Sequence, residues 1–186
     1  MAPTSLRTAR LILRPFASAD LAPFAALNVH PQVVRMLGST PTRSESDAMV
    51  ERYTAELVRQ GWGVWALEVV GGAPFVGFCG LHAVPEYLAF SPGIEVGWRL
   101  HPMFWGHGYA TEAALAALEY GFGTAGVEEI VSFTAAVNLP SQAVMRRIGM
   151  TRDARGDFAH PKVPVDSDLK PHVLYRIHPP STVPTQ

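Results

Sequence analysis

A short glycine-bearing segment, Trp105 to Ala110, is the part of the chain whose residue types and spacing are most suited to chemistry. It reads W-G-H-G-Y-A and directly precedes an expected helix. Gly106 and Gly108 would let several backbone N–H groups converge where that helix begins, and a helix N-terminus attracts anions. The segment therefore predicts a phosphate-binding loop. An ordinary strand-to-helix turn is the alternative, because isolated glycine motifs are common.

The elements on either side of this loop would hold it in place. Apolar and polar residues alternate between residues 94 and 100, which predicts a half-buried strand. Beyond Gly108 the apolar residues recur at helical spacing, and Gly121 and Gly123 predict the end of that helix. Two named phosphate motifs do not fit. The chain has no G-K-[ST] triplet, and Thr111 stands where a dinucleotide-binding loop has its third glycine.

The same stretch resembles motif A of the GNAT acyltransferases, [QR]-x-x-G-x-[GA], with Gly108 and Ala110 at its small positions. Trp105 replaces the usual Gln or Arg, as in the ribosomal-protein N-acetyltransferase branch, where W-G-x-G-Y-A-T-E-A is typical. The resemblance implies that main-chain groups near Trp98 and Leu100 pair with the pantetheine arm of acetyl-CoA. It also implies that the loop holds the pyrophosphate, through Trp105, Gly106, His107, Gly108, Tyr109, Ala110 and Thr111.

A second stretch resembles motif B of the same family, N-x-x-[SA]-x(7)-G-[FM], with Asn138 and Ser141 at its first positions. The resemblance implies that Asn138 contacts the pantetheine arm. Many family members carry a tyrosine four residues after the Ser/Ala position as general acid, but Met145 stands there and cannot donate a proton. Ser141 is the substitute that the branch suggests, and a helix-start role for Ser141 is the alternative.

Glu95 is the candidate general base, because it lies on the same strand face as Gly97 and Arg99, and the family often places a carboxylate on this strand. A surface carboxylate paired with Arg99 is the alternative. Glu112 is the weaker candidate, because an acid in the first turn of a helix matches the helix dipole.

Other polar residues suggest less specific roles. A wall of the acceptor site is expected from Asp157, His160, Asp166 and Asp168, whose acidic groups would suit a cationic amine; a solvated loop is the alternative. The seven histidines show no recognised ligand spacing, so no metal is expected.

Length and composition indicate one domain, residues 1–186, structured over about residues 6–178 with short flexible tails. Apolar residues make up 48% and charged residues 17%, with a formal net charge of −1, so neither disorder nor a nucleic-acid partner is expected. The chain has a single cysteine, no signal peptide and no membrane-spanning stretch, which predicts a soluble cytoplasmic protein. We expect either a monomer or a homodimer.

The order of the expected elements predicts a mixed α/β sheet. Residues 62–70 and 75–81 form an expected hairpin, which precedes the strand, loop and helix described above. Ser44 and Asp47 suggest the capping box of an earlier helix. The resemblance implies a GNAT-like fold, mostly antiparallel, with a central splayed strand pair flanked by helices.

The resemblance implies an N-acetyltransferase that transfers acetyl from acetyl-CoA to a primary amine by direct attack in a ternary complex. The acceptor is either a protein N-terminus or a small-molecule amine. Two alternatives remain: a non-catalytic acyl-CoA-binding module, which Met145 would suit, and a nucleotide-binding regulator.

Overall fold

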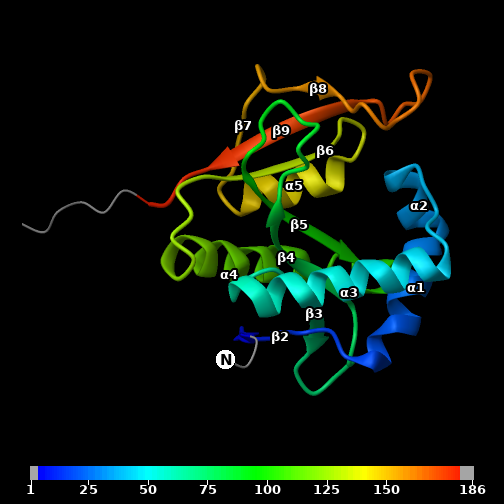
Figure 1. Cartoon of the computed structure of the whole chain (residues 1–186), viewed down its shortest axis with the longest axis vertical. Helices are drawn as coiled ribbons and strands as arrows, with labels where there is room; N and C mark the ends of the chain where they lie inside the picture. The colour runs from blue at the N-terminus through cyan, green and yellow to red at the C-terminus, as the bar shows by residue number, and fades with distance from the viewer. Residues whose placement is uncertain (1–3, 181–186) are drawn as a thin grey trace, which may run out of the picture.

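A computed structural model describes residues 4–180 of the chain (Figure 1). The elements in chain order are β1 (Leu6–Arg7), β2 (Leu11–Arg14), η1 (Ser18–Asp20), α1 (Leu21–Val29), α2 (Pro31–Leu37), α3 (Arg43–Gln60), β3 (Val64–Val69), β4 (Gly77–Ala83), β5 (Ile94–Leu100), η2 (Pro102–Phe104), α4 (Tyr109–Gly123), β6 (Ile130–Ala135), α5 (Leu139–Arg147), β7 (Thr151–Arg152), β8 (Phe158–Ala159) and β9 (Pro171–Ile177).

One sheet connects all the described strands. Its order is β1-β2-β3-β4-β5-β6-β9-β7, and β8 pairs with β9. All neighbours are antiparallel except β5 and β6, which are parallel. Figure 1 shows β6 to β9 and α5 at one end of the molecule, β2 and β3 at the other, and β4 and β5 between them. The predicted mixed, mostly antiparallel sheet is confirmed.

The two faces of the sheet bury separate apolar clusters, because side chains of one strand alternate between faces. Trp65 and Cys79 lie in the cluster that contains α4 and α5 residues. Their neighbours Val64 and Phe78 lie in the cluster that contains residues of α1, α2 and α3. The polar face of β5 therefore looks toward α1–α3, and its apolar face looks toward α4.

The prediction that Gly121 helps to end α4 is wrong, because the helix continues through it to Gly123. Gly121 is buried, and a Cβ there would lie 2.8 Å from Leu81 Cδ1 and 2.9 Å from Ile130 Cδ1. The missing side chain thus lets α4 pack closely on the sheet. The predicted extent of the strand over residues 94–100 is confirmed.

The capping box of α3 lies two residues earlier than predicted. Thr42 is the N-cap residue, its hydroxyl accepts from the amide of Glu45, and Glu45 accepts from the amide of Thr42. Ser44 and Asp47 have the same spacing but lie inside the helix, where Asp47 forms an ion pair with Arg43.

Much of the two predicted tails lies outside the described residues. Thr4, which was expected to be in the first tail, is attached to the core, because its carbonyl accepts a 2.8 Å hydrogen bond from Trp65 Nε1. Cys79 is buried, as expected for a core thiol. Within residues 4–180 no helix is long and apolar enough to span a membrane, and no group of three potential metal-binding side chains occurs.

Candidate functional site

Strands β5 and β6 separate soon after they meet. Their parallel pairing is limited to Ile94 with Ile130 and Glu95 with Val131, whereas β5 pairs with β4 over its whole length. Beyond Glu95, the β6-facing backbone of β5 therefore has no strand partner in the described chain, and this is the splay that the resemblance implies. Trp98 and Leu100, the residues expected beside a pantetheine arm, lie on this stretch.

The glycine loop follows at the end of β5 and opens α4. Gly106 and Gly108 have φ angles of +78° and +79°, a left-handed conformation that side chains other than glycine rarely adopt. In the described chain no acceptor is bound by the amides of residues 106–111, which include the first turn of α4 at Tyr109, Ala110 and Thr111. A Cβ at Gly106 would meet no atom within 4 Å, so the space beside this residue is open. These free N–H groups at a helix N-terminus fit an anion.

Trp105 and His107 hold the loop in shape. The indole Nε1–H of Trp105 donates a 2.7 Å hydrogen bond to the carbonyl of Leu100, which ties the loop to the end of β5. His107 Nδ1 lies 2.9 Å from the Trp105 carbonyl, and its ring stacks on that of Tyr109 with 5.5 Å between the centroids. The tryptophan at the family's Gln/Arg position is thus an anchor of the loop.

Arg10, which the sequence reasoning missed, brings a cation to the loop. Its Nη1 donates to the His107 carbonyl at 2.9 Å, and its guanidinium lies 5.0 Å from the centre of the Tyr109 ring. Nη2 also lies 2.6 Å from Glu112 Oε2. Burial raises the pKa of Glu112, but hydrogen bonds from Thr8 and Arg10 outweigh it and leave that pKa below its ordinary value. Glu112 is therefore an anchor for Arg10 and a poor proton acceptor.

Glu95 lies on the other side of β5 and is buried, with 8% of its surface exposed. Its Oε2 lies 3.6 Å from Nε2 of His82, the residue directly opposite it on β4. Burial raises the pKa of Glu95 well above the usual carboxyl value and lowers the pKa of His82. The surface-carboxylate alternative is therefore wrong. A buried carboxyl whose pKa is raised suits general-base catalysis near neutral pH.

Arg99 does not pair with Glu95. Its Nη1 donates to the side-chain carbonyl of Asn28, which is fully buried on α1, and its guanidinium lies 5.2 Å from the centre of the Phe78 ring. Tyr53 of α3 lies nearby. Burial is the main cause that raises the pKa of Tyr53, and the charge of Glu95 also raises it, whereas the charges of Arg99 and Arg52 lower it. His82, Glu95, Arg99 and Tyr53 thus form a polar cluster between β5 and the α1–α3 layer. Tyr53 also packs against the apolar cluster of the α1–α3 layer. Sequence reasoning missed His82.

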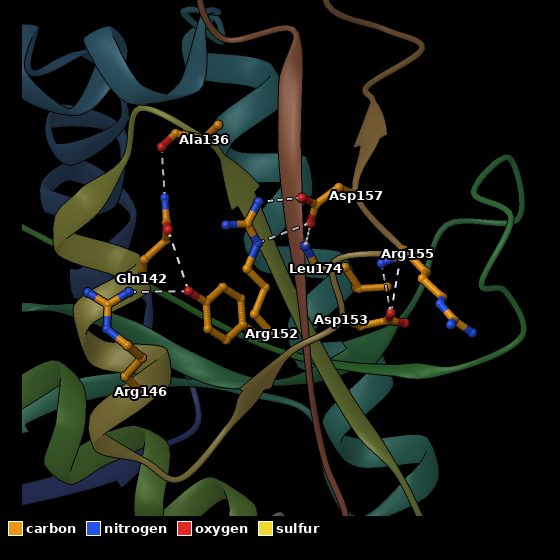
Figure 2. Close-up of polar contacts among 10 residues, drawn as sticks. Ala136, Gln142, Arg146, Arg152, Asp153, Arg155, Asp157 and Leu174 are labelled. Atoms are coloured by element: carbon orange, nitrogen blue, oxygen red, sulfur yellow. Dashed lines mark hydrogen bonds and ion pairs between the residues drawn. The ribbon is translucent and has the colours of Figure 1, made fainter.

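The second motif lies at the start of α5. Asn138 is the N-cap residue: its Oδ1 accepts from the Ser141 amide at 3.3 Å, and its Nδ2 donates to Thr134 Oγ1 at 3.0 Å. The Ser141 hydroxyl makes no hydrogen bond in the described chain, and the residue is half-buried. Met145 is 1% exposed and packs in the core. Gln142 fixes the same helix by donating to the Ala136 carbonyl at 2.8 Å (Figure 2).

The expected acidic wall of the acceptor site is only partly available. Asp157 is engaged by Arg152 and accepts from the Leu174 amide, as Figure 2 shows, so it holds β7 and β9 together. His160 stacks with His172, with 4.8 Å between their ring centres. The structure does not test whether Asp166 and Asp168 contact an acceptor.

Residues 10–151 match the family described as Acetyltransferase (GNAT) domain. The chain belongs to the GNAT family. This GNAT chain is 32% identical over 154 residues to the FsC-acetyl coenzyme A-N(2)-transacetylase of Aspergillus fumigatus, covering 79% of this chain but only 65% of the relative. It shares 28% identity and a TM-score of 0.77 with an acetyltransferase from Agrobacterium tumefaciens, over 96% of each chain.

A solved structure of lower sequence identity has the same fold. A ribosomal L7/L12 α-N-protein acetyltransferase in complex with coenzyme A is 15% identical, with a TM-score of 0.73 over 94% of this chain and 98% of that one. At this identity the likeness establishes the fold alone. The GNAT family is therefore confirmed, and the ribosomal-protein branch stays a prediction.

Proposed function

We propose that this protein is an N-acetyltransferase that transfers acetyl from acetyl-CoA to a primary amine within a ternary complex. The observation that carries the proposal is the run of unbound amides at residues 106–111, shaped by two left-handed glycines at the start of α4. A diphosphate fits this site because it offers several oxygens to N–H donors and carries the charge that a helix N-terminus favours. Acetyl-CoA bound there supplies an acetyl thioester.

The cofactor-binding residues we assign lie along one path. The loop, Trp105 to Thr111, and the nearby Arg10 would hold the pyrophosphate. The unpaired backbone of β5 from Trp98 to Leu100 would hydrogen-bond the pantetheine arm, which is an extended amide chain and can act as an added strand. The Asn138 carboxamide, although it caps α5, borders the same opening between β5 and β6 and could contact the arm with its remaining lone pair.

The chemical steps require two proton carriers, which we assign to Glu95 and Ser141. Glu95 would accept the proton of the attacking amine, because burial makes its carboxylate more basic than usual. Ser141 would donate to the departing sulfur, because its hydroxyl is not used by the helix cap. Backbone N–H groups of β5 that lack a strand partner would stabilise charge on the carbonyl oxygen.

The acceptor class within this proposal is an amine on a small molecule or a protein N-terminus. One relative is named as a transacetylase acting at an N(2) position, which supports nitrogen as the acceptor atom. A non-catalytic acyl-CoA-binding module is the second candidate, because Met145 lies in the core and supplies no acid.

Two measurements test the proposal. Acetyl-CoA at about a hundred times its dissociation constant should raise the free energy of unfolding by roughly 2.7 kcal/mol, seen as a higher melting temperature. Thiol release from acetyl-CoA should then depend on an added amine, with the acetylated amine identified by mass spectrometry. Stabilisation without amine-dependent thiol release would favour the binding module, and no stabilisation at millimolar acetyl-CoA would refute both candidates.

A further inference from the structure

A cavity of about 540 Å³ lies between the α2–α3 connection and α3, and it includes Arg99 of the polar cluster. Its floor includes Arg99 of β5, and Arg52 of α3 contributes a second guanidinium. The remaining lining is neutral except for Glu45. Glu45 is already engaged, because it accepts hydrogen bonds from the amide and hydroxyl of Thr42 at the N-cap of α3. The cavity therefore presents two cations and one carboxylate, whose Oε2 is held at the N-cap of α3.

Neither arginine has an ionic partner within residues 4–180. Arginines elsewhere in the same region do pair: Arg14 with Asp20 and Glu68, and Arg43 with Asp47. Arg99 instead donates to the neutral amide of Asn28 and is half-buried. Holding a partly buried guanidinium without a counter-ion is costly, so such an arrangement indicates a function in binding.

Asn28 sets the orientation of Arg99. Its amide nitrogen donates to Ser46 Oγ at 3.1 Å, which fixes the carboxamide so that its oxygen faces Arg99. A guanidinium has five N–H donors, and this contact uses only one of its terminal nitrogens. Donors therefore remain for a planar, two-oxygen anion such as a carboxylate.

The cavity and the candidate base lie on the same face of β5. Glu95 and Arg99 are four residues apart, so their Cα atoms are separated by about 13 Å along the strand. Arg52 lies over the Tyr53 ring at 5.3 Å, and Tyr53 is close enough to Glu95, Arg99 and Arg52 to be affected by all three charges. One small molecule could thus place its amine near Glu95 and a second group between the arginines.

We propose that Arg52 and Arg99 form an anion subsite, and that the acceptor is a small-molecule amine carrying a carboxylate. This inference rests on the proposed acetyltransferase function and deepens it, by replacing the expected acidic acceptor wall with a basic one. The subsite fixes the far end of the acceptor and leaves the amine to face Glu95.

The test compares acceptors that differ only in the carboxylate. Linear ω-amino acids from three to eight carbons are paired with alkylamines of the same length, with acetyl-CoA as donor and thiol release as readout. We expect a kcat/KM advantage of about tenfold to hundredfold for the best amino acid over its alkylamine, the range expected for hydrogen bonds to a charged group. Phosphonate analogues of that length show whether the subsite requires a planar carboxylate.

Three variants assign the effect to the cavity. Arg52→Gln and Arg99→Gln should each remove most of the carboxylate advantage, with a much smaller change in alkylamine turnover. Arg59→Gln is the matched control, because Arg59 is an exposed arginine of the same helix that does not line the cavity. If Arg99→Gln fails to fold because Asn28 loses its partner, the exposed Arg52 still tests the subsite.

The outcomes separate the two proposals. Alkylamines that are acetylated as well as the amino acids, or an advantage that survives Arg52→Gln, would overturn the anion subsite while leaving the acetyltransferase function intact. If no amine of either kind is acetylated, the proposed function fails and the subsite fails with it.

Discussion

Replacing Glu95 by Gln should slow acetyl transfer and, at the same time, stabilise the fold. Both effects follow from one observation: a carboxyl that is 8% exposed, with His82 Nε2 at 3.6 Å, has its pKa raised by burial. Gln keeps the shape and a hydrogen-bonding oxygen but can neither accept a proton nor carry a charge. The substitution therefore separates the work of the carboxylate from the packing of the side chain.

The rate effect depends on pH. Loss of a positioned general base costs about 10²–10⁴ in rate, equivalent to roughly 3–5 kcal/mol in activation free energy. The wild-type rate should rise as pH increases through the raised pKa of Glu95, because only the ionised form accepts the proton. The variant should lack this rise, so the difference is largest above that pKa and narrows below it.

The stability effect has the opposite sign. Between the ordinary carboxyl pKa and the raised one, the native state keeps a proton that the unfolded chain has released, so wild-type stability falls as pH rises through this interval. Each unit by which the pKa is raised costs about 1.4 kcal/mol at higher pH. Glu95→Gln avoids this cost, so its free energy of unfolding should exceed that of wild type increasingly as pH rises from the ordinary carboxyl pKa to the raised pKa of Glu95.

Denaturant unfolding at several pH values, together with kcat against pH, measures both effects. His82 also titrates, with its pKa lowered by burial, but it is present in both proteins, so their difference reports chiefly on Glu95. A constant difference in stability across pH would show that Glu95 is not desolvated. A variant with the wild-type rate at high pH would show that Glu95 is not the base.

Three further substitutions test the other parts of the site. Gly108→Val should weaken acetyl-CoA binding at least tenfold in titration calorimetry, because φ at Gly108 is +79° and a valine there would shift the loop amides. Gly123→Ala is the control, because Gly123 has no positive φ and a Cβ there would meet no atom within 4 Å. If the Gly108→Val variant binds acetyl-CoA as tightly as wild type, the loop is only a structural turn. Ser141→Ala should lower kcat because it removes the proposed general acid. It should leave the melting temperature unchanged, because the cap hydrogen bond uses the Ser141 amide and not its hydroxyl. An unchanged kcat would show that Ser141 is not the acid. Met145→Ala should destabilise the fold by about 2–5 kcal/mol and leave the pH profile of kcat unchanged, and a shifted profile would place Met145 at the site.

The parts of the fold that sequence predicted well are those determined locally. The strand ending at Leu100, the loop and the helix beginning at Tyr109 each have a pattern that is complete within a few residues. Gly121 shows the limit of such patterns. Its role depends on Leu81 and Ile130, which reach it from two strands. Its own neighbours along the chain therefore suggest a helix end at Gly121, two residues before the observed one.

In the candidate site, too, the sequence predicts local features but not contacts between distant segments. Glu95 could be selected from its strand, but its burial and its contact with His82 depend on the register between β4 and β5, which sequence alone did not provide. Arg10 and Arg52 were missed for the same reason. Arg10 lies far along the chain from His107 and Glu112, as Arg52 does from Arg99 of the same cavity. An exposed arginine has no local pattern that distinguishes a binding role from solvation.

The contacts of Arg10 also constrain the order in which parts of the protein can fold during synthesis. It bonds the carbonyl of His107, 97 residues later in the chain, and the carboxylate of Glu112. During synthesis, Arg10 emerges from the ribosome long before the loop that it steadies, so the proposed coenzyme site cannot be completed until the start of α4 has followed. Closing so long a loop costs entropy that only later packing repays. Acetyl-CoA binding by ribosome-bound chains of increasing length would then mark when the first strands dock.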